Sequence, residues 1–205
     1  MSELKVNKIS PRSGTDVTLG DSGDTFTLGS GANIAGLTLS DNILFDTASK
    51  GIYLSVTSAT ASNLLDDYEE GTWTPNIQAS GNHYGSVTYT VQLGYYTKVG
   101  RLVTAHFRVQ ISAYTIGSAT GNINIESLPF TNTNNQNCAS AIDYASNINY
   151  DLSSFNPIHV GINVKLNTVH AGLTRTKNNG TADGVPASAL GSAADIQGVL
   201  IYYVD

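Results

Sequence analysis

The chain has 205 residues and a mass of 21.6 kDa, and its 10 Lys and Arg residues against 16 Asp and Glu residues give a formal net charge of −6. Only 13% of the residues are charged, and Ser, Thr, Asn and Gly are abundant instead. Such a length allows one full domain, or one domain with a smaller appendage. The composition indicates a β protein with a surface of hydroxyls and amides, unlike a cytosolic helical enzyme.

Several classes of protein are excluded by the same features. No apolar run approaches the length needed to span a bilayer, so no membrane insertion is expected. The first residues, MSELK, lack the apolar core of a signal peptide, so secretion by that route is not expected. The single cysteine, Cys138, rules out an intrachain disulfide and a cysteine-based zinc site. An acidic chain with scattered basic residues also lacks the positive stripe of a nucleic-acid-binding protein.

The N-terminal part of the chain shows a weak internal repeat. Residues 1–16 are short and irregular, and from residue 17 the triplets TLG, TLG and LTL follow one another at residues 18–20, 27–29 and 37–39. Strands this short cannot bury a face alone, so the repeat predicts stacked rungs or association with copies from other chains. The alternative is a string of hairpins packed on the main domain.

Residues 17–65 are therefore predicted to form a β stalk. The segment 17–58 has too few apolar side chains for a closed core, whereas three copies around an axis would share one. The side chains expected to point toward that axis are Leu19, Phe26, Leu28, Ile34, Leu37 and Leu39.

An acidic stretch follows the predicted stalk. Residues 61–70 favour a helical turn or two, with Ser62 as its N-cap and Gly71 closing it. Residues 66–70, DDYEE, are the densest run of charge. A glycosidase needs two carboxylates that face each other across a sugar, and neighbours on one strand do not. We interpret residues 66–71 as a solvated acidic hinge.

From residue 72 to residue 205 the pattern predicts an antiparallel β-sandwich. Short alternating segments, each bounded by Gly, Asn, Ser or Pro, recur without a long helical pattern between them. The predicted strands lie at residues 87–91, 102–111, 123–125, 142–144, 158–169 and 199–204. Residues 178–180, NNG, predict a tight turn, and residues 131–137 predict an exposed polar loop.

No catalytic motif and no cofactor site emerges from the sequence. The histidines, His83, His106, His159 and His170, and Cys138 show no ligand spacing, so a zinc site would have to be assembled by folding or by a symmetry axis. We expect His106 to be a partly buried strand residue. No Gly-x-Ser-x-Gly nucleophile elbow and no phosphate loop is present.

The tyrosines are more suggestive, because nine of the 11 follow residue 80. Aromatic rings beside amides and hydroxyls can hold carbohydrate. The alternative is that Tyr simply suits half-buried strands. The candidate receptor-binding residues are Tyr114, Asn134, Asn135, Tyr144 and Tyr150.

Four segments resemble a known family. Residues 66–75, DDYEEGTWTP, are similar to a signature at the start of C-terminal domains in many bacteriophage tail-fibre-like virion proteins. Residues 94–103, GYYTKVGRLV, resemble the segment that follows in the same proteins, and residues 128–130, LPF, resemble a third element. Residues 20–27, GDSGDTFT, look like a strand of marine and cyanobacterial phage fibres.

The resemblance implies a homotrimer on the surface of a phage particle. It implies an N-terminal virion-attachment segment, residues 1–16, that contacts other virion proteins, and a C-terminal β-sandwich of the jelly-roll type. The side chains assigned to attachment are Leu4, Val6, Ile9 and Pro11. The resemblance brings no catalytic residues. The chain is far shorter than most tail fibres and lacks a long shaft.

Three functions follow as expectations. The first is a non-enzymatic virion structural protein, a trimeric tail fibre or knob that binds a host surface receptor such as a glycan, where three copies multiply a weak affinity. The alternative is a capsid decoration protein, a cement or head-fibre protein anchored to the head by its N-terminus. A second alternative is a glycan depolymerase, which requires carboxylates converging in one groove.

Overall fold

In this computed structural model, the described residues are 43–45, 49–54, 57–133, 138–150, 157–177 and 180–205. The chain divides into two units, residues 1–44 and residues 45–205, and nearly all described residues belong to the second. The predicted attachment residues Leu4, Val6, Ile9 and Pro11 lie outside the described residues. So do the predicted stalk residues Leu19, Phe26, Leu28, Ile34, Leu37 and Leu39.

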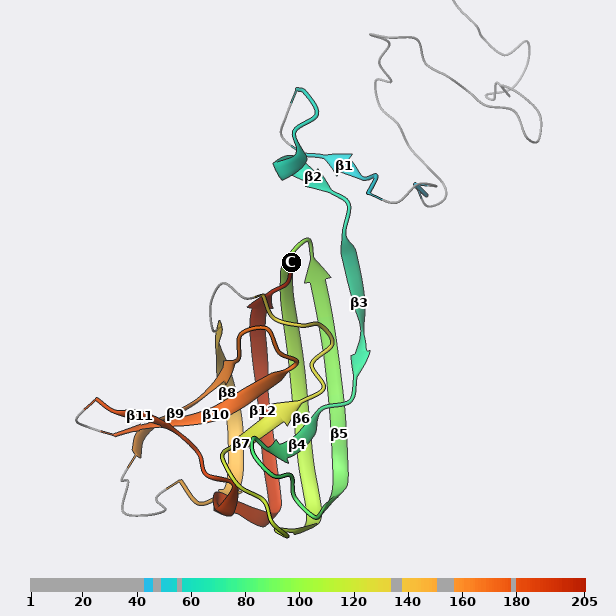
Figure 1. Ribbon diagram of the computed structural model, residues 1–205. Helices are drawn as coiled ribbons and strands as arrows, with labels where there is room; N and C mark the ends of the chain where they lie inside the picture. Colours follow the sequence, from blue (N-terminus) through green and yellow to red (C-terminus); the bar gives the residue numbers. More distant parts are fainter. Residues whose placement is uncertain (1–42, 46–48, 55–56, 134–137, 151–156, 178–179) are drawn as a thin grey trace, which may run out of the picture. The chain divides into compact units, whose positions relative to one another are not determined.

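The described part of the chain consists of β-strands and two 3-10 turns, which confirms the all-β prediction (Figure 1). A small hairpin pairs β1 (Ile52–Tyr53) with β2 (Leu64–Leu65), and the turn η1 (Ala61–Asn63) precedes β2. The remaining elements are β3 (Tyr68–Trp73), β4 (Asn76–Ala79), β5 (Ser86–Val99), β6 (Leu102–Thr115), β7 (Ile123–Glu126), β8 (Cys138–Ile148), β9 (Pro157–Val164), β10 (His170–Lys177), β11 (Ala182–Gly184), η3 (Ala187–Ala189) and β12 (Leu190–Tyr203). No helix in the described residues is long and apolar enough to cross a membrane.

Ten strands form one antiparallel sheet that curls over on itself. Its order is β3-β5-β6-β12-β8-β9-β10-β7-β4, and β11 pairs with β10. We call β3, β5, β6 and β12 the long-strand half, and β9, β10, β7 and β4 the short-strand half. Strand β8 pairs with β12 on one side and with β9 on the other, so it joins the two halves (Figure 1).

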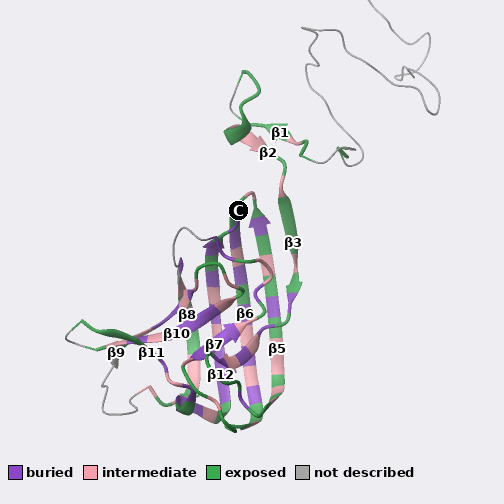
Figure 2. Ribbon diagram, viewed as in Figure 1, coloured by how far each residue is buried: buried purple, intermediate pink, exposed green. Residues whose placement is uncertain are grey.

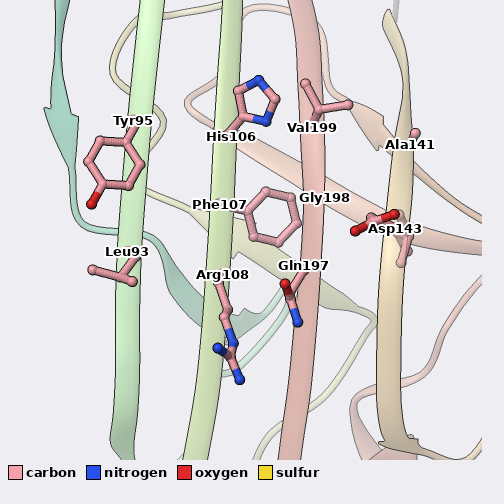
Figure 3. Close-up of a pocket in the computed structure, with 11 residues that line it drawn as sticks. Leu93, Tyr95, His106, Phe107, Arg108, Ala141, Asp143, Gln197, Gly198 and Val199 are labelled. Carbon is pink, nitrogen blue, oxygen red and sulfur yellow. The ribbon is translucent and has the colours of Figure 1, made fainter.

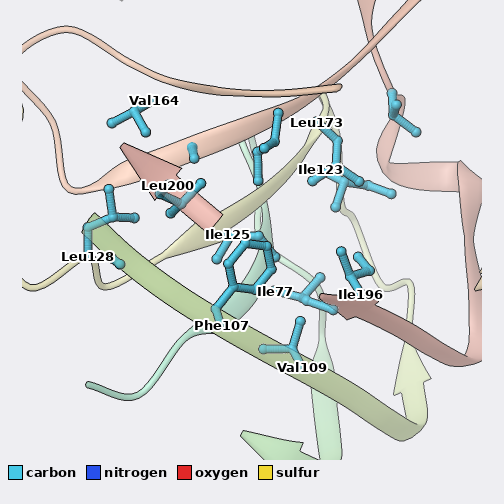
Figure 4. Close-up of a cluster of buried hydrophobic side chains, with 14 of the residues drawn as sticks. Ile77, Phe107, Val109, Ile123, Ile125, Leu128, Val164, Leu173, Ile196 and Leu200 are labelled. Carbon is cyan, nitrogen blue, oxygen red and sulfur yellow. The ribbon is translucent and has the colours of Figure 1, made fainter. Parts of the chain in front are cut away.

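The two halves pack face to face around one hydrophobic core (Figure 4). Along β6 every second side chain is buried, from Val103 to Ile111, as expected for a strand with one face on the core. These side chains meet fully buried residues of the other half, among them Ile77, Ile125 and Leu173. In Figure 2 the buried segments gather on β6, β7, β10 and β12. The predicted sandwich is thereby confirmed.

Two of the segments that carry the family resemblance are neighbours in the sheet. Strand β3 pairs with β5 so that Gly71 lies opposite Tyr96 and Trp73 lies opposite Gly94. A Cβ atom on Gly94 would lie 2.5 Å from the Trp73 indole, and one on Gly71 would lie 2.8 Å from the Tyr96 hydroxyl. Each glycine therefore leaves room for the aromatic ring of the opposite strand, which explains the pairing of Gly with an aromatic residue in both segments.

The third segment packs against the same place. The Phe130 ring meets the Tyr96 ring edge to face at 5.2 Å, and the Lys98 ammonium lies 5.6 Å from the centre of the Phe130 ring. Lys98 in turn bonds the carboxylate of Asp67, and Tyr96 donates its hydroxyl to Glu69. Three segments that are far apart in sequence thus form one packed cluster.

The helical turn predicted over residues 61–70 is borne out only at its start. Only Ala61–Asn63 form a 3-10 turn, with Thr60 rather than Ser62 at its N-cap, and strand β3 begins at Tyr68. The acidic side chains are not merely solvated, because Asp67, Glu69 and Glu70 bond Lys98, Tyr96 and Tyr68, respectively. These partners, supplied largely by the neighbouring strand, outweigh the helical pattern of the local sequence.

Two further predictions concern loops. Of the turn predicted at residues 178–180, residues 178 and 179 lie outside the described residues; Gly180 has a φ of +85°, and the flanking strands β10 and β11 pair antiparallel. The loop predicted to be exposed at residues 131–137 is not exposed at Asn132 and Thr133, because both residues are buried. Asn132 donates to the Lys165 carbonyl through its side chain and Thr133 donates to the carboxylate of Asp205, so their polar groups are satisfied inside the fold.

Candidate functional site

The outer face of the long-strand half carries an exposed apolar row. Residues paired directly across antiparallel strands place their side chains next to each other on one face. Strand pairing aligns one residue each from β3, β5, β6 and β12 in this way, at the end of the sandwich where β3 begins. This apolar row consists of Tyr68, Val99, Leu102 and Tyr203, which are 62%, 46%, 38% and 44% exposed.

A groove runs across the same face farther along the strands. Its centre is another row of paired residues, in which Tyr95 lies beside His106, His106 beside Val199, and Val199 beside Ala141. The groove has a volume of about 560 Å³ and is more apolar than polar (Figure 3). We call it the sheet groove; its remaining outward side chains include Leu93, Arg108, Asp143 and Gln197.

One charged pair fixes the floor of the sheet groove. Arg108 donates two hydrogen bonds to the buried carboxylate of Asp195, at 3.2 Å from Nε and 2.8 Å from the terminal nitrogen. These bonds and the charge of Asp195 raise the pKa of Arg108. Because the guanidinium is already engaged in a two-bond pair, Arg108 serves mainly to hold β6 against β12.

The carboxylates of this face do not form a facing pair. Asp143 is the single acidic side chain among the described residues that line the sheet groove, and Asp195 is bonded to Arg108. Hydrolysis of a glycosidic bond by the usual mechanism needs two carboxylates on opposite sides of the sugar. The sheet groove is therefore better suited to contact than to that reaction.

The structure does not bring the predicted receptor-binding tyrosines onto one surface. Tyr144 is 48% exposed on β8, whereas Tyr114 and Tyr150 pack against the core. Tyr114 donates its hydroxyl to the Leu190 carbonyl, and its ring meets that of Tyr84 edge to face at 5.7 Å. Burial raises the pKa of Tyr150 to about 12. Asn134 and Asn135 lie outside the described residues.

The histidines and the cysteine are dispersed. His106 is exposed on the outer face of β6, not partly buried as predicted, because the inner face of that strand is taken by Ala105 and Phe107. Cys138 is buried. Within the part of the chain that the structure describes, no three His, Cys, Asp or Glu side chains gather as a metal site would require.

The apolar row and the sheet groove were missed in the sequence because their members come from four strands. Each strand alternates as expected, but alternation alone does not tell which outward residues become neighbours. One feature of the sequence does indicate which residues of β5 and β6 are neighbours: the two-residue connection at Gly100 and Arg101, which fixes the register of these two strands.

Comparison with known proteins finds a likeness of fold. No family model matches the sequence, and no curated protein matches it. The fold is similar to that in the crystal structure of the Dettilon tailspike protein, with a TM-score of 0.51 and 19% sequence identity. The match covers 67% of this chain and 24% of the tailspike chain. The matched two thirds of the chain thus shares its fold with a part of that tailspike protein.

Proposed function

We propose that this protein is a non-enzymatic structural component of a phage virion, a trimeric tail fibre or knob that binds a receptor on the host surface. The observation that carries the proposal is the packed cluster of the three resembling segments around Tyr96 and Phe130. The similarity of the fold to a part of a tailspike protein supports it independently.

The apolar row supports the trimeric part of the proposal. Large exposed apolar patches on a soluble protein mark places where it meets another surface. Exposed apolar side chains continue before β3, at Ile52, Tyr53, Leu54 and Leu65. In the proposed trimer the apolar row meets the same region of neighbouring copies, and the N-terminal stalk continues this contact.

The non-enzymatic part rests on the arrangement of the carboxylates. Asp67, Glu69 and Asp195 are each bonded to a partner side chain, and the described residues that line the sheet groove include no acid besides Asp143. A depolymerase remains the alternative if another copy supplies the second carboxylate to Asp143. Reducing-end release from bacterial polysaccharide, measured with wild type and Asp143→Asn, distinguishes this alternative.

A capsid decoration protein is the second candidate, because its sequence and fold would be the same. Imaging of virions labelled with an antibody against residues 72–205 tests the proposal directly. We expect label at the tail, together with competition between purified protein and phage for adsorption to host cells. Label spread over the capsid facets, with no competition, would establish decoration instead.

A further inference from the structure

The outer face of the short-strand half is lined with amides instead of apolar side chains. Strand pairing places Gln78 beside Asn124, Asn124 beside Gly172, and Gly172 beside Asn163, across β4, β7, β10 and β9. This is an unusual composition for four adjacent positions, because Asn and Gly are both depleted in strands.

A second groove opens over this row, with a volume of about 370 Å³. We call it the amide groove. Its lining comes from β7, β10, β11 and the turn between β9 and β10, and includes Asn122, Asn124, Lys165, His170, Gly172 and Asp183.

The strongest sign of a ligand is Asn124. Its residue is only 3% exposed, yet its side-chain amide makes no hydrogen bond to any described residue and lines the groove. The side-chain oxygen of its neighbour Gln78 is also buried without a partner among the described residues. A buried amide without a partner destabilises a fold, because it has lost its hydrogen bonds to water. The side-chain amide of Asn124, which belongs to a nearly buried residue, makes no bond to any described residue and lines the groove, and it therefore points to a polar ligand.

Glycine keeps the floor of the groove open. A Cβ atom on Gly172 would lie 3.1 Å from the Lys165 side chain and 3.3 Å from the Asn124 side-chain oxygen. Any larger side chain at this position would fill the space above the amide. The bare backbone therefore lets a ligand approach Asn124 closely.

The charges around the groove define the ligand class. Around the groove, Lys165 and Arg175 are positive and Glu126 and Asp183 are negative; Glu126 lies opposite His170, and Asp183 lies 3.6 Å from the guanidinium of Arg175. The surroundings are thus close to neutral, and amides both donate and accept hydrogen bonds, as hydroxyl groups do. A ligand rich in hydroxyls and without net charge satisfies this lining best.

We propose that the amide groove binds a sugar residue of a neutral polysaccharide, with Asn124 and Asn122 as its principal hydrogen-bonding partners. This inference rests on the proposed receptor-binding function and names its site and its ligand class. The site lies on the half of the sandwich opposite to the apolar row, so trimer formation through the row leaves it open.

The test begins with the full chain on an array of bacterial surface polysaccharides. Oligosaccharide fragments of the polysaccharide that binds are then titrated into protein labelled with ¹⁵N, and the side-chain amide resonances are followed. We expect the resonances of Asn124 and Asn122 to shift, and the array hits to be uncharged saccharides. Because wild-type protein is used, no variant has to fold for this measurement.

Variants then locate the site. Asn124→Ala and Gly172→Val should each weaken binding of the same fragment about tenfold or more, since one good hydrogen bond amounts to about this factor. Gln197→Ala, which removes an amide from the sheet groove, is the matched control and should leave the affinity unchanged. Asn122→Ala serves in place of Asn124→Ala if the latter fails to fold.

The outcomes separate the inference from the proposed function. Binding of a polysaccharide without shifts at Asn124 and Asn122, or binding lost with Gln197→Ala alone, would overturn the amide groove and leave the receptor function standing. Hits confined to acidic polysaccharides would overturn the ligand class. No binding to any polysaccharide or to host cells would contradict the receptor function, and the inference with it.

Discussion

The two outer faces of the sandwich differ although the same curled sheet builds both. On the long-strand half, directly paired outward positions carry Tyr68, Val99, Leu102 and Tyr203, whereas on the short-strand half they carry Gln78, Asn124, Gly172 and Asn163. Covering exposed apolar side chains with another surface is favourable, because apolar area leaves water. Amides bind favourably when a ligand supplies matching hydrogen-bond donors and acceptors. This difference is the basis for the proposal that one face contacts protein partners and the other a hydroxylated ligand.

The largest expected effect concerns the assembly. The double substitution Leu102→Glu and Tyr203→Glu would place carboxylates in the middle of the proposed contact, where burial of unpaired charge costs several kcal/mol. Light scattering of the wild-type protein should give three times the chain mass of 21.6 kDa, and the variant should give the mass of one chain. Asn122→Ala on the opposite face is the control and should stay trimeric. A monomeric wild type at micromolar concentration would contradict the proposed trimer.

The second effect concerns the core that both faces share. Gly94→Ala would place a methyl group 2.5 Å from the Trp73 indole, and such overpacking should lower the free energy of unfolding by about 1–3 kcal/mol. Gly85→Ala is a matched control, because its Cβ would make ordinary contacts at 3.5 Å. Urea denaturation measures both. Equal stability of the two variants would show that the Trp73 ring can move aside.

A smaller effect separates packing from recognition among the tyrosines. Tyr114→Phe removes the hydroxyl that bonds the Leu190 carbonyl, so it should reduce the free energy of unfolding by about 1 kcal/mol. It should leave polysaccharide binding unchanged, since Tyr114 lies against the core. Tyr144→Phe, on the exposed side of β8, should leave stability unchanged. Lost polysaccharide binding with Tyr114→Phe would return this residue to the receptor site.

The smallest effect is a pH dependence at the amide groove. Burial, together with the charge of Lys165, lowers the pKa of His170 from 6.5, and Glu126 opposes the shift. The unfolded chain therefore takes up a proton at a higher pH than the folded chain, so stability falls as the pH drops from above 6.5 toward the lowered pKa. Urea denaturation above and below pH 6.5 measures how the free energy of unfolding depends on pH. The substitution His170→Gln should remove the contribution of His170 to this dependence. The same pH dependence in the variant and the wild type would contradict this role of His170.

The strands of the core were largely predictable from the sequence. The segments 102–111 and 123–125 alternate apolar and polar residues, and both lie within strands whose inner side chains are buried. Strand β3 was not predictable from its own residues, because a charged run such as Glu69-Glu70 favours exposure. Its pairing with β5, the bond from Tyr96 to Glu69 and the fit of Trp73 over Gly94 stabilise it as a strand.

The candidate binding surfaces were much less predictable. Tyr114 and Tyr150 have the residue type of a carbohydrate site, but the core takes up their rings. Asn124 carries no sign of a binding site in the sequence, because Ile123-Asn124-Ile125 has only the alternating pattern of a strand. Its position beside Gln78 and Gly172 depends on β4, β7 and β10, which are separated along the chain and meet only in the folded sheet.

The sequence by itself determined the class of this protein: an all-β chain with polar surfaces, a sandwich after the acidic stretch, and segments similar to those of phage fibres. This information is local, because alternation, turn residues and short motifs act over a few neighbouring residues. The tertiary structure alone decided which outward residues became neighbours, and so separated an apolar face from an amide-lined one. That separation depends on strand order and register, which are set by packing between distant segments.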